Sequence, residues 1–287
     1  MDWKGRGRRK PYPCQAGQRG RNRPLRWGWL ALIILTAFCV PGRANIDGDS
    51  LLEDLHYRVD VLIWRDAARA RLTLKSLGTG RYQAEISGGP RGVLKSISGD
   101  RRDSYRTDMV WRDGRLLPLV YREESRRQGK RHLKEYRFDY AQGKLEMWQL
   151  KTGKGMVLKW HTTLTEPIYD PLTAFYNCRL GFLGPVRGGQ VFKLRGIPYP
   201  KPEEIEVRIG EETGQGFKTM ISFFDQARKK STLVYAYLDD QRVPKQAWTT
   251  VLGVGTISGE LLPGGKGLKA RLPDLATGKV ASQAPGS

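Results

Sequence analysis

The chain has 287 residues, and its 50 Lys and Arg outnumber its 29 Asp and Glu, which gives a formal charge of +21 at neutral pH. Residues 1–44 hold ten basic residues and one acid, so +12 remains on the rest and favours anionic partners. Only Cys178 lies beyond residue 44, which excludes a disulfide-stapled scaffold for the body of the protein.

The N-terminal region predicts export. Residues 1–26 are rich in Gly, Arg and Pro, without an apolar period, and are expected to be a disordered basic extension. Residues 27–44 read as a signal-peptide core and cleavage region, with arginines before the apolar run 27–40 and small residues at Gly42 and Ala44. A helix of that apolar length spans about 21 Å, short of the roughly 30 Å hydrocarbon core. A short inner-membrane anchor through residues 27–40, left uncleaved, is the alternative.

Export sets the compartment and the partners. Residues from 45 onward would work in the periplasm or cell envelope, where the anions are phospholipid head groups, lipopolysaccharide and acidic glycans. Nucleic acid is therefore not expected as a partner, although the charge alone would allow it.

Residues 45–262 predict a single β-rich domain. Apolar and polar residues alternate with period two, as in residues 55–63 and 68–74, and Gly-bearing turns recur every eight to twelve residues. Thirteen or fourteen strands are expected, in a mainly antiparallel meander that curls into a half-barrel, barrel or sandwich. The fold class is thus all-β, and residues 263–287 read as a disordered tail.

One short helix, at about 170–180, interrupts the strands. Asp170 can cap it and Pro171 suits its first position, while Gly181 ends it. Leu172, Phe175 and Tyr176 fall on one stripe, which is expected to pack over the concave side of the sheet as a plug or lid. Truncation of Asn177 would cost little if that residue lies on the outer side.

Catalytic signals are weak. The three histidines, His56, His132 and His161, show no metal-ligand spacing, and neither a phosphate-binding loop nor a nucleophile elbow is present. Asp239-Asp240 before Pro244 is typical of a turn, and Cys178 is expected to be a buried core residue. No catalytic residue, metal or cofactor is predicted.

The densest exposed charge is expected at a hairpin tip around Gln128-Gly129. Five basic residues flank this turn, and they are Arg126, Arg127, Lys130, Arg131 and Lys134. The tip is either a solvated turn or a contact with an anionic surface. Glu123, Glu124 and Glu135 at its base would mute the charge.

Two stretches resemble a known family. Residues 170–179, DPLTAFYNCR, are similar to its D-x-L-S-x-x-Y-x-x-R helix, with Thr173 where Ser is common. Val234–Leu262, with the corner from Asp239 to Pro244, is similar to its C-terminal end. The family is the bacterial envelope group known as domain of unknown function 3108. The resemblance implies a periplasmic β-rich domain, without an established activity or transferable catalytic residues. By fold analogy alone, it suggests the open half-barrels of lipoprotein carriers.

These observations favour an exported binding or assembly protein for an apolar or amphipathic ligand, such as a lipid or a lipoprotein segment. A curved sheet of this strand number can enclose such a ligand. A structural, partner-binding envelope protein is one alternative. A hydrolase-type enzyme, with polar groups converging from separate strands, is the other.

Overall fold

The computed structural model describes residues 50–197, 201–225, 230–251 and 255–268. The predicted extension (1–26), the signal region (27–44) and the tail from residue 269 lie outside this part. None of the described helices is long and apolar enough to cross a bilayer.

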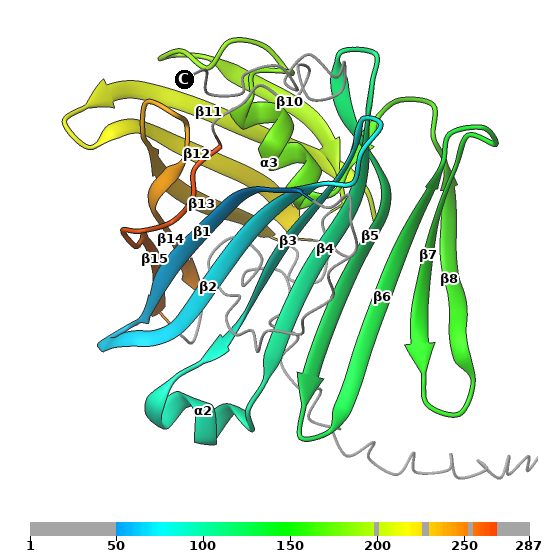
Figure 1. The fold of residues 1–287 in the computed structure, drawn as a ribbon, viewed down its shortest axis with the longest axis horizontal. Helices are drawn as coiled ribbons and strands as arrows, with labels where there is room; N and C mark the ends of the chain where they lie inside the picture. Colours follow the sequence, from blue (N-terminus) through cyan, green and yellow to red (C-terminus); the bar gives the residue numbers. More distant parts are fainter. Residues whose placement is uncertain (1–49, 198–200, 226–229, 252–254, 269–287) are drawn as a thin grey trace, which may run out of the picture.

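The described strands form one sheet of 15 strands (Figure 1). The N-terminal meander contains β1 (Ser50–Val61), β2 (Trp64–Ser76), β3 (Arg81–Pro90), β4 (Arg102–Arg112), β5 (Arg115–Arg127), β6 (Lys130–Asp139), β7 (Lys144–Lys151) and β8 (Gly155–Thr163). The C-terminal part contains β9 (Ile168–Tyr169), β10 (Val191–Gly196), β11 (Glu203–Thr213), β12 (Gly216–Asp225), β13 (Lys230–Leu238), β14 (Pro244–Val251) and β15 (Gly255–Leu261). The helices are α2 (Gly92–Ser98) and α3 (Pro171–Arg179).

The first and last strands join the two halves of the sheet. β1 pairs antiparallel with β15, so Tyr57 lies opposite Leu261 and Val61 opposite Ile257. The order therefore runs from β8 to β1, then from β15 to β9, with β8 and β9 as open edges. The predicted all-β meander is confirmed, and of its three predicted shapes the open, curved sheet is the one found.

Period-two alternation produces these strands as expected. On β2, Ala68, Ala70 and Leu72 are buried, while Arg69 and Arg71 lie on the other face. Arg71 donates two hydrogen bonds of 2.8 Å to Asp54 of β1, and this ion pair links the two strands on the outer face.

Three features depart from the expectations. α2 was not predicted, and neither was β9, which pairs parallel with β10 over two residues. Residues 263–268, which the sequence assigns to the tail, include Lys266, and this residue exchanges backbone hydrogen bonds of 2.8 and 2.7 Å with Asp54 of β1.

The interior divides into two clusters that differ in kind. The cluster under β3–β7 is built on fully buried aromatic side chains, among them Tyr82, Tyr121 and Tyr136. The cluster under β10–β15 is mostly aliphatic, with Val207, Ile209 and Ile257. Helix α3 lies in the concave space between the two walls (Figure 1).

Candidate functional site

Helix α3 begins as its sequence predicts. The Asp170 carboxylate accepts hydrogen bonds from the backbone N–H groups of Leu172 (2.9 Å) and Thr173 (3.1 Å), and Pro171 occupies the first position. Asp170 also accepts from the Thr107 hydroxyl of β4 at 2.9 Å. Burial raises the pKa of Asp170, against the opposing effect of the Thr173 and Thr107 hydrogen bonds. The cap is thus also a tie to the sheet.

A second tie fixes the middle of the helix. Asn177 is fully buried; its Oδ1 accepts from the Leu116 N–H at 2.9 Å, and its Nδ2 donates to the Leu116 carbonyl at 2.8 Å. Because β5 pairs with β6 only from Val120 onward, the Leu116 peptide has no strand partner on that side. Asn177 supplies the missing partner. The outer position considered for Asn177 is therefore wrong.

A third tie fixes the end of the helix. The Arg179 guanidinium contacts the buried carboxylate of Glu53 on β1 at 2.5 Å, and the Tyr176 hydroxyl donates to the same oxygen at 2.9 Å. Burial works to lower the pKa of Arg179, but its hydrogen bond to Glu53 and the attraction of the Glu53 charge act together against burial, and the pKa stays above its usual value. Both charges are withdrawn from water and balance each other.

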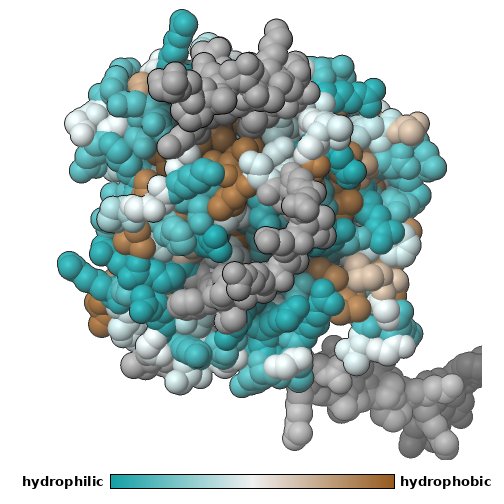
Figure 2. Space-filling model, in the orientation of Figure 1, coloured by the Kyte–Doolittle hydropathy of each residue, from teal (hydrophilic) through white to brown (hydrophobic). Residues whose placement is uncertain are grey.

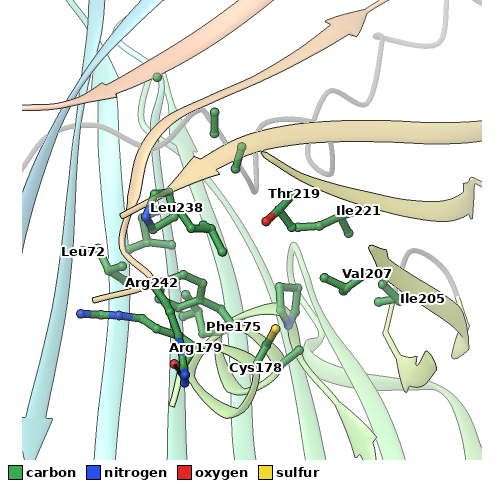
Figure 3. A pocket seen from close by; sticks show the side chains of 18 of the residues that line it. Leu72, Phe175, Cys178, Arg179, Ile205, Val207, Thr219, Ile221, Leu238 and Arg242 are labelled. Carbon is green, nitrogen blue, oxygen red and sulfur yellow. Dashed lines mark hydrogen bonds between the residues drawn. The ribbon is translucent and has the colours of Figure 1, made fainter. Parts of the chain in front are cut away.

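The opposite face of α3 borders a cavity of about 210 Å³. Pro171, Ala174, Phe175 and Cys178, three or four positions apart, form one stripe that lines it, and Leu172 and Arg179 border it as well. Figure 3 shows Phe175 and Cys178 across an open space from side chains of β11 and β12. Leu72 of β2 and Leu238 of β13 also line it, so both halves of the sheet contribute.

The cavity wall is almost entirely apolar. Ile205, Val207, Ile221 and Phe223 cover it from β11 and β12. Hydrophobic residues also gather among hydrophilic ones toward the centre of the face in Figure 2. A cavity of about 150 Å³ is enough to admit benzene, so this one has room for a comparable apolar group or a short chain segment.

Few polar groups face this space. Thr219 of β12 is buried, and its hydroxyl has no hydrogen-bond partner among the described residues. Arg242 is half-buried at the wall and donates to the Arg179 carbonyl at 3.2 Å. Burial raises the pKa of the Cys178 thiol to about 11, so the thiol stays protonated at neutral pH and is a poor nucleophile.

This arrangement suits binding better than bond-making chemistry. The polar groups that converge on α3, including Asp170, Asn177 and Glu53, are engaged with one another or with the backbone, away from the cavity. Within the part of the chain that the structure describes, no three His, Cys, Asp or Glu side chains form a metal-binding group.

The sequence-predicted helix residues differ in burial. Leu172 and Tyr176 are buried, whereas Phe175 is half-buried and lines the cavity. Residues 239–244 form a turn, in which the Asp239 carboxylate accepts from the Val243 N–H at 2.8 Å. Cys178 is half-buried against the apolar wall.

The basic hairpin lies far from α3, at the other end of the sheet (Figure 1). Three of its five basic side chains are paired. Glu124 contacts Arg126 at 2.5 Å and Arg131 at 2.8 Å, and Glu123 contacts Lys134 at 2.6 Å. Arg127 and Lys130 make no ion pair with any described residue. Glu123 and Glu124 mute the charge, as the sequence suggested, whereas Glu135 pairs with Arg122 and Arg137 instead.

Sequence reasoning missed Glu53, Thr107 and Asn177, which hold the helix, and the strand residues that line the cavity. A local signal existed for Glu53, because it shares the inner face of β1 with Leu55. Its partner, however, lies 126 positions away. No local pattern could have identified the pair.

Comparison with known proteins identifies the family of this chain. Residues 54–252 match the model of a family described as "Protein of unknown function (DUF3108)". No curated protein and no solved structure matches. Since the match covers more than half of the chain, and the predicted helix and curved sheet are both present, the chain belongs to the DUF3108 family.

Proposed function

We propose that this protein binds an apolar or amphipathic ligand, such as an acyl chain, in the cavity between α3 and the C-terminal strands. The observation that carries the proposal is the wall itself. Side chains from α3 and from strands of both halves form an apolar surface around unfilled space, although protein interiors are normally close-packed. An unfilled apolar cavity costs stability, so its retention is understandable if a ligand occupies it.

Two polar groups favour an amphipathic ligand with an acceptor or anionic head. Arg242 makes no ion pair with a described carboxylate, in contrast to Arg179, whose charge Glu53 balances. The buried Thr219 hydroxyl lies on the same wall and can donate a hydrogen bond to a ligand, since no described residue accepts one from it. A ligand carboxylate or phosphate near Arg242 would supply the counter-charge that no described carboxylate provides.

We place this binding in the cell envelope. The support is the sequence of residues 21–44, with its basic flank, apolar run and small residues before Asn45. The expected result is cleavage after Ala44 and recovery in the periplasmic fraction. N-terminal sequencing that finds residues 27–44 intact favours the anchored form, and recovery in the cytosol contradicts export.

A binding titration tests the cavity directly. The probes are a fluorescent fatty acid and the matching fatty alcohol, each titrated into the full chain. Ala236 lies on the cavity wall, so Ala236→Phe should fill the space and weaken both probes at least tenfold. Ala141→Phe, in an exposed turn, is the matched control.

A second variant tests the head group. Arg242→Gln should weaken the acid about tenfold and leave the alcohol unchanged, because only the acid carries a charge. Ala236→Phe protein that melts as the parent does and still binds both probes with parental affinity contradicts the proposal. Equal loss of both probes on Arg242→Gln contradicts the head-group assignment alone.

A further inference from the structure

The hairpin connections of the N-terminal meander gather at two opposite ends of the sheet. In an antiparallel meander successive connections alternate between ends. Residues 62–63, 91–101, 128–129 and 152–154 therefore share one end, which Figure 1 shows as the end that carries α2. We call this the α2 end.

The α2 end carries a projecting apolar tip. Leu62, Ile63 and Trp64, at the turn between β1 and β2, are 57%, 87% and 46% exposed. Ile63 is the most exposed of the large hydrophobic side chains in the described residues. Large apolar side chains at such a turn gain nothing from folding, because water surrounds them. Their location calls for a partner.

The tip is held firmly in place. The Leu62 N–H donates to the Thr256 carbonyl of β15 at 2.9 Å, and the Leu62 side chain lies so close to Gly255 that a Cβ there would overlap it. Asp60 accepts from the Asp66 N–H at 2.7 Å across the base of the turn. Ile63 and Trp64 thus project from a fixed backbone.

Basic side chains flank this tip. Arg91 pairs with Asp66 at 3.0 Å and so ties the start of α2 to the β1–β2 turn. Beyond it, a shallow cleft of about 800 Å³ between α2 and the basic hairpin is lined by Lys95, Arg102, Arg126 and Arg127, with Asp100 as its acid. The Gln128 N–H donates to the Gly99 carbonyl at 3.3 Å and joins the two connections.

Several basic side chains at or beside the four connections of the α2 end are available to an outside partner. Among the described residues, no ion pair involves Arg65, Lys95, Arg127 or Lys130, and Lys151 and Lys154 are exposed at the fourth connection. Each cation close to an anionic bilayer contributes about fivefold to partitioning, and the contributions multiply.

We infer that the α2 end docks on an anionic lipid bilayer, with Ile63 and Trp64 inserted among the lipids and the basic side chains on the head groups. Trp favours the membrane interface, and a basic surface next to an apolar wedge is the pattern of interfacial attachment. A three-residue tip is far smaller than the roughly 800 Å² that each partner buries in a stable protein interface. The inference does not rest on the cavity.

Vesicle partitioning of the full chain tests this inference, with anionic phosphatidylglycerol vesicles against neutral phosphatidylcholine vesicles. Ile63→Ser combined with Trp64→Ser should weaken partitioning into anionic vesicles at least tenfold. The matched control is Val191→Ser, at the other end of the sheet and 42% exposed. All variants keep residues 21–44, so that segment contributes equally to each.

A second pair of variants tests the charges. Arg127→Gln with Lys130→Gln should lower partitioning into anionic vesicles about 25-fold at low salt, fivefold for each cation removed. Arg81→Gln with Arg112→Gln removes the same charge from the opposite end and should have little effect. Equal losses from both pairs mean attraction by net charge alone and overturn the inference. Unchanged partitioning of the Ile63/Trp64 variant also overturns it.

Quenching by brominated lipid gives an independent measurement that needs no loss of binding. Trp64→Phe should lower the quenched fraction of tryptophan fluorescence in anionic vesicles, because Trp64 is one of the tryptophans in contact with lipid. Trp248→Phe is the control, because Trp248 is half-buried on β14 and stacks on Tyr235. An unchanged quenched fraction on Trp64→Phe places the tip outside the bilayer and refutes the docking.

Discussion

The two faces of helix α3 are built on different principles. The face toward β1, β4 and β5 is held by directional polar contacts through Asp170, Asn177 and Arg179. The face toward β11 and β12 has apolar side chains such as Ala174 and Phe175, with open space in front of them. Because one face alone positions the helix, the other face is free to remain unfilled. A cavity can persist here without loosening the element that borders it.

The same comparison explains the helix motif. Asp170, Thr173, Tyr176 and Arg179 are buried and bonded on the anchored side, and Leu172 is buried beside them. Ala174, Phe175 and Cys178, which lie between the motif positions, line the cavity together with Leu172 and Arg179 of the motif. The polar motif positions therefore set the place of the helix, and the residues between them supply most of the helix surface that a ligand would meet.

Breaking the end of the anchored face should have the largest effect. Arg179→Met leaves the buried Glu53 carboxylate without its counter-charge and should cost about 3–5 kcal/mol of unfolding free energy. Urea denaturation measures this loss. The control is Arg195→Met, which breaks the exposed pair with Glu166 and should cost less than about 1 kcal/mol.

A double variant identifies the cause of that loss. Glu53→Gln with Arg179→Met removes both charges and should recover part of the stability that Arg179→Met loses. A double variant less stable than Arg179→Met would mean that the charge left on Glu53 is not what destabilises the single variant.

Asn177→Ala should have the next largest effect. It leaves the Leu116 N–H and carbonyl without partners at a buried strand edge, at a cost of about 2–3 kcal/mol. Urea denaturation measures the change. A loss below about 0.5 kcal/mol would mean that water replaces the Asn177 side chain, and that the anchored face does not depend on it.

The contrast between Phe175 and Asn177 shows how far the sequence predicts this site. Alternation is a local property, so the strands and their all-β class were predictable, as was the capped start at Asp170-Pro171. The side of the helix that each residue faces depends on the sheet around it. Apolarity suggested that Phe175 is buried and Asn177 outside, but the Leu116 peptide lacks a strand partner and recruits Asn177 instead.

The other misses have the same physical origin. Glu53 is a carboxylate within a strand, and only the arrival of Arg179 from α3 makes its burial tolerable. β9 is two residues long and exists because β10 pairs with it. The sheet stays open because its last neighbours are β8 and β9, and an alternating sequence specifies faces but not which edges meet.

Phe175→Ala sharpens the comparison from the cavity side. The side chain is half-buried, so its truncation should cost about 1–2 kcal/mol, below the roughly 3–5 kcal/mol of a fully buried Phe. It should also weaken the fluorescent fatty acid, because it removes part of the cavity wall. If Phe175→Ala lowers stability more than Asn177→Ala does, the cavity face also holds the helix in place, which contradicts the assignment of that role to the anchored face alone.

The smallest expected change concerns pH and the helix cap. Burial raises the pKa of Asp170 above its unfolded value, so the native state binds the proton more tightly than the unfolded state does. The stabilising contribution of Asp170 is therefore fully present below its unfolded pKa, near 3.9, and is lost as the pH rises through the raised native value. Asp170→Asn keeps an oxygen that can accept from the Leu172 and Thr173 N–H groups but has no charge to bury. Its stability relative to the parent should therefore increase with pH across this window. Urea denaturation of both proteins from about pH 3.5 to 7 measures the difference, in which the titration of all other groups cancels. A pH-independent difference would mean that the pKa of Asp170 is the same in the folded and unfolded states. The hydrogen bonds of the fold would then stabilise the carboxylate as well as water does.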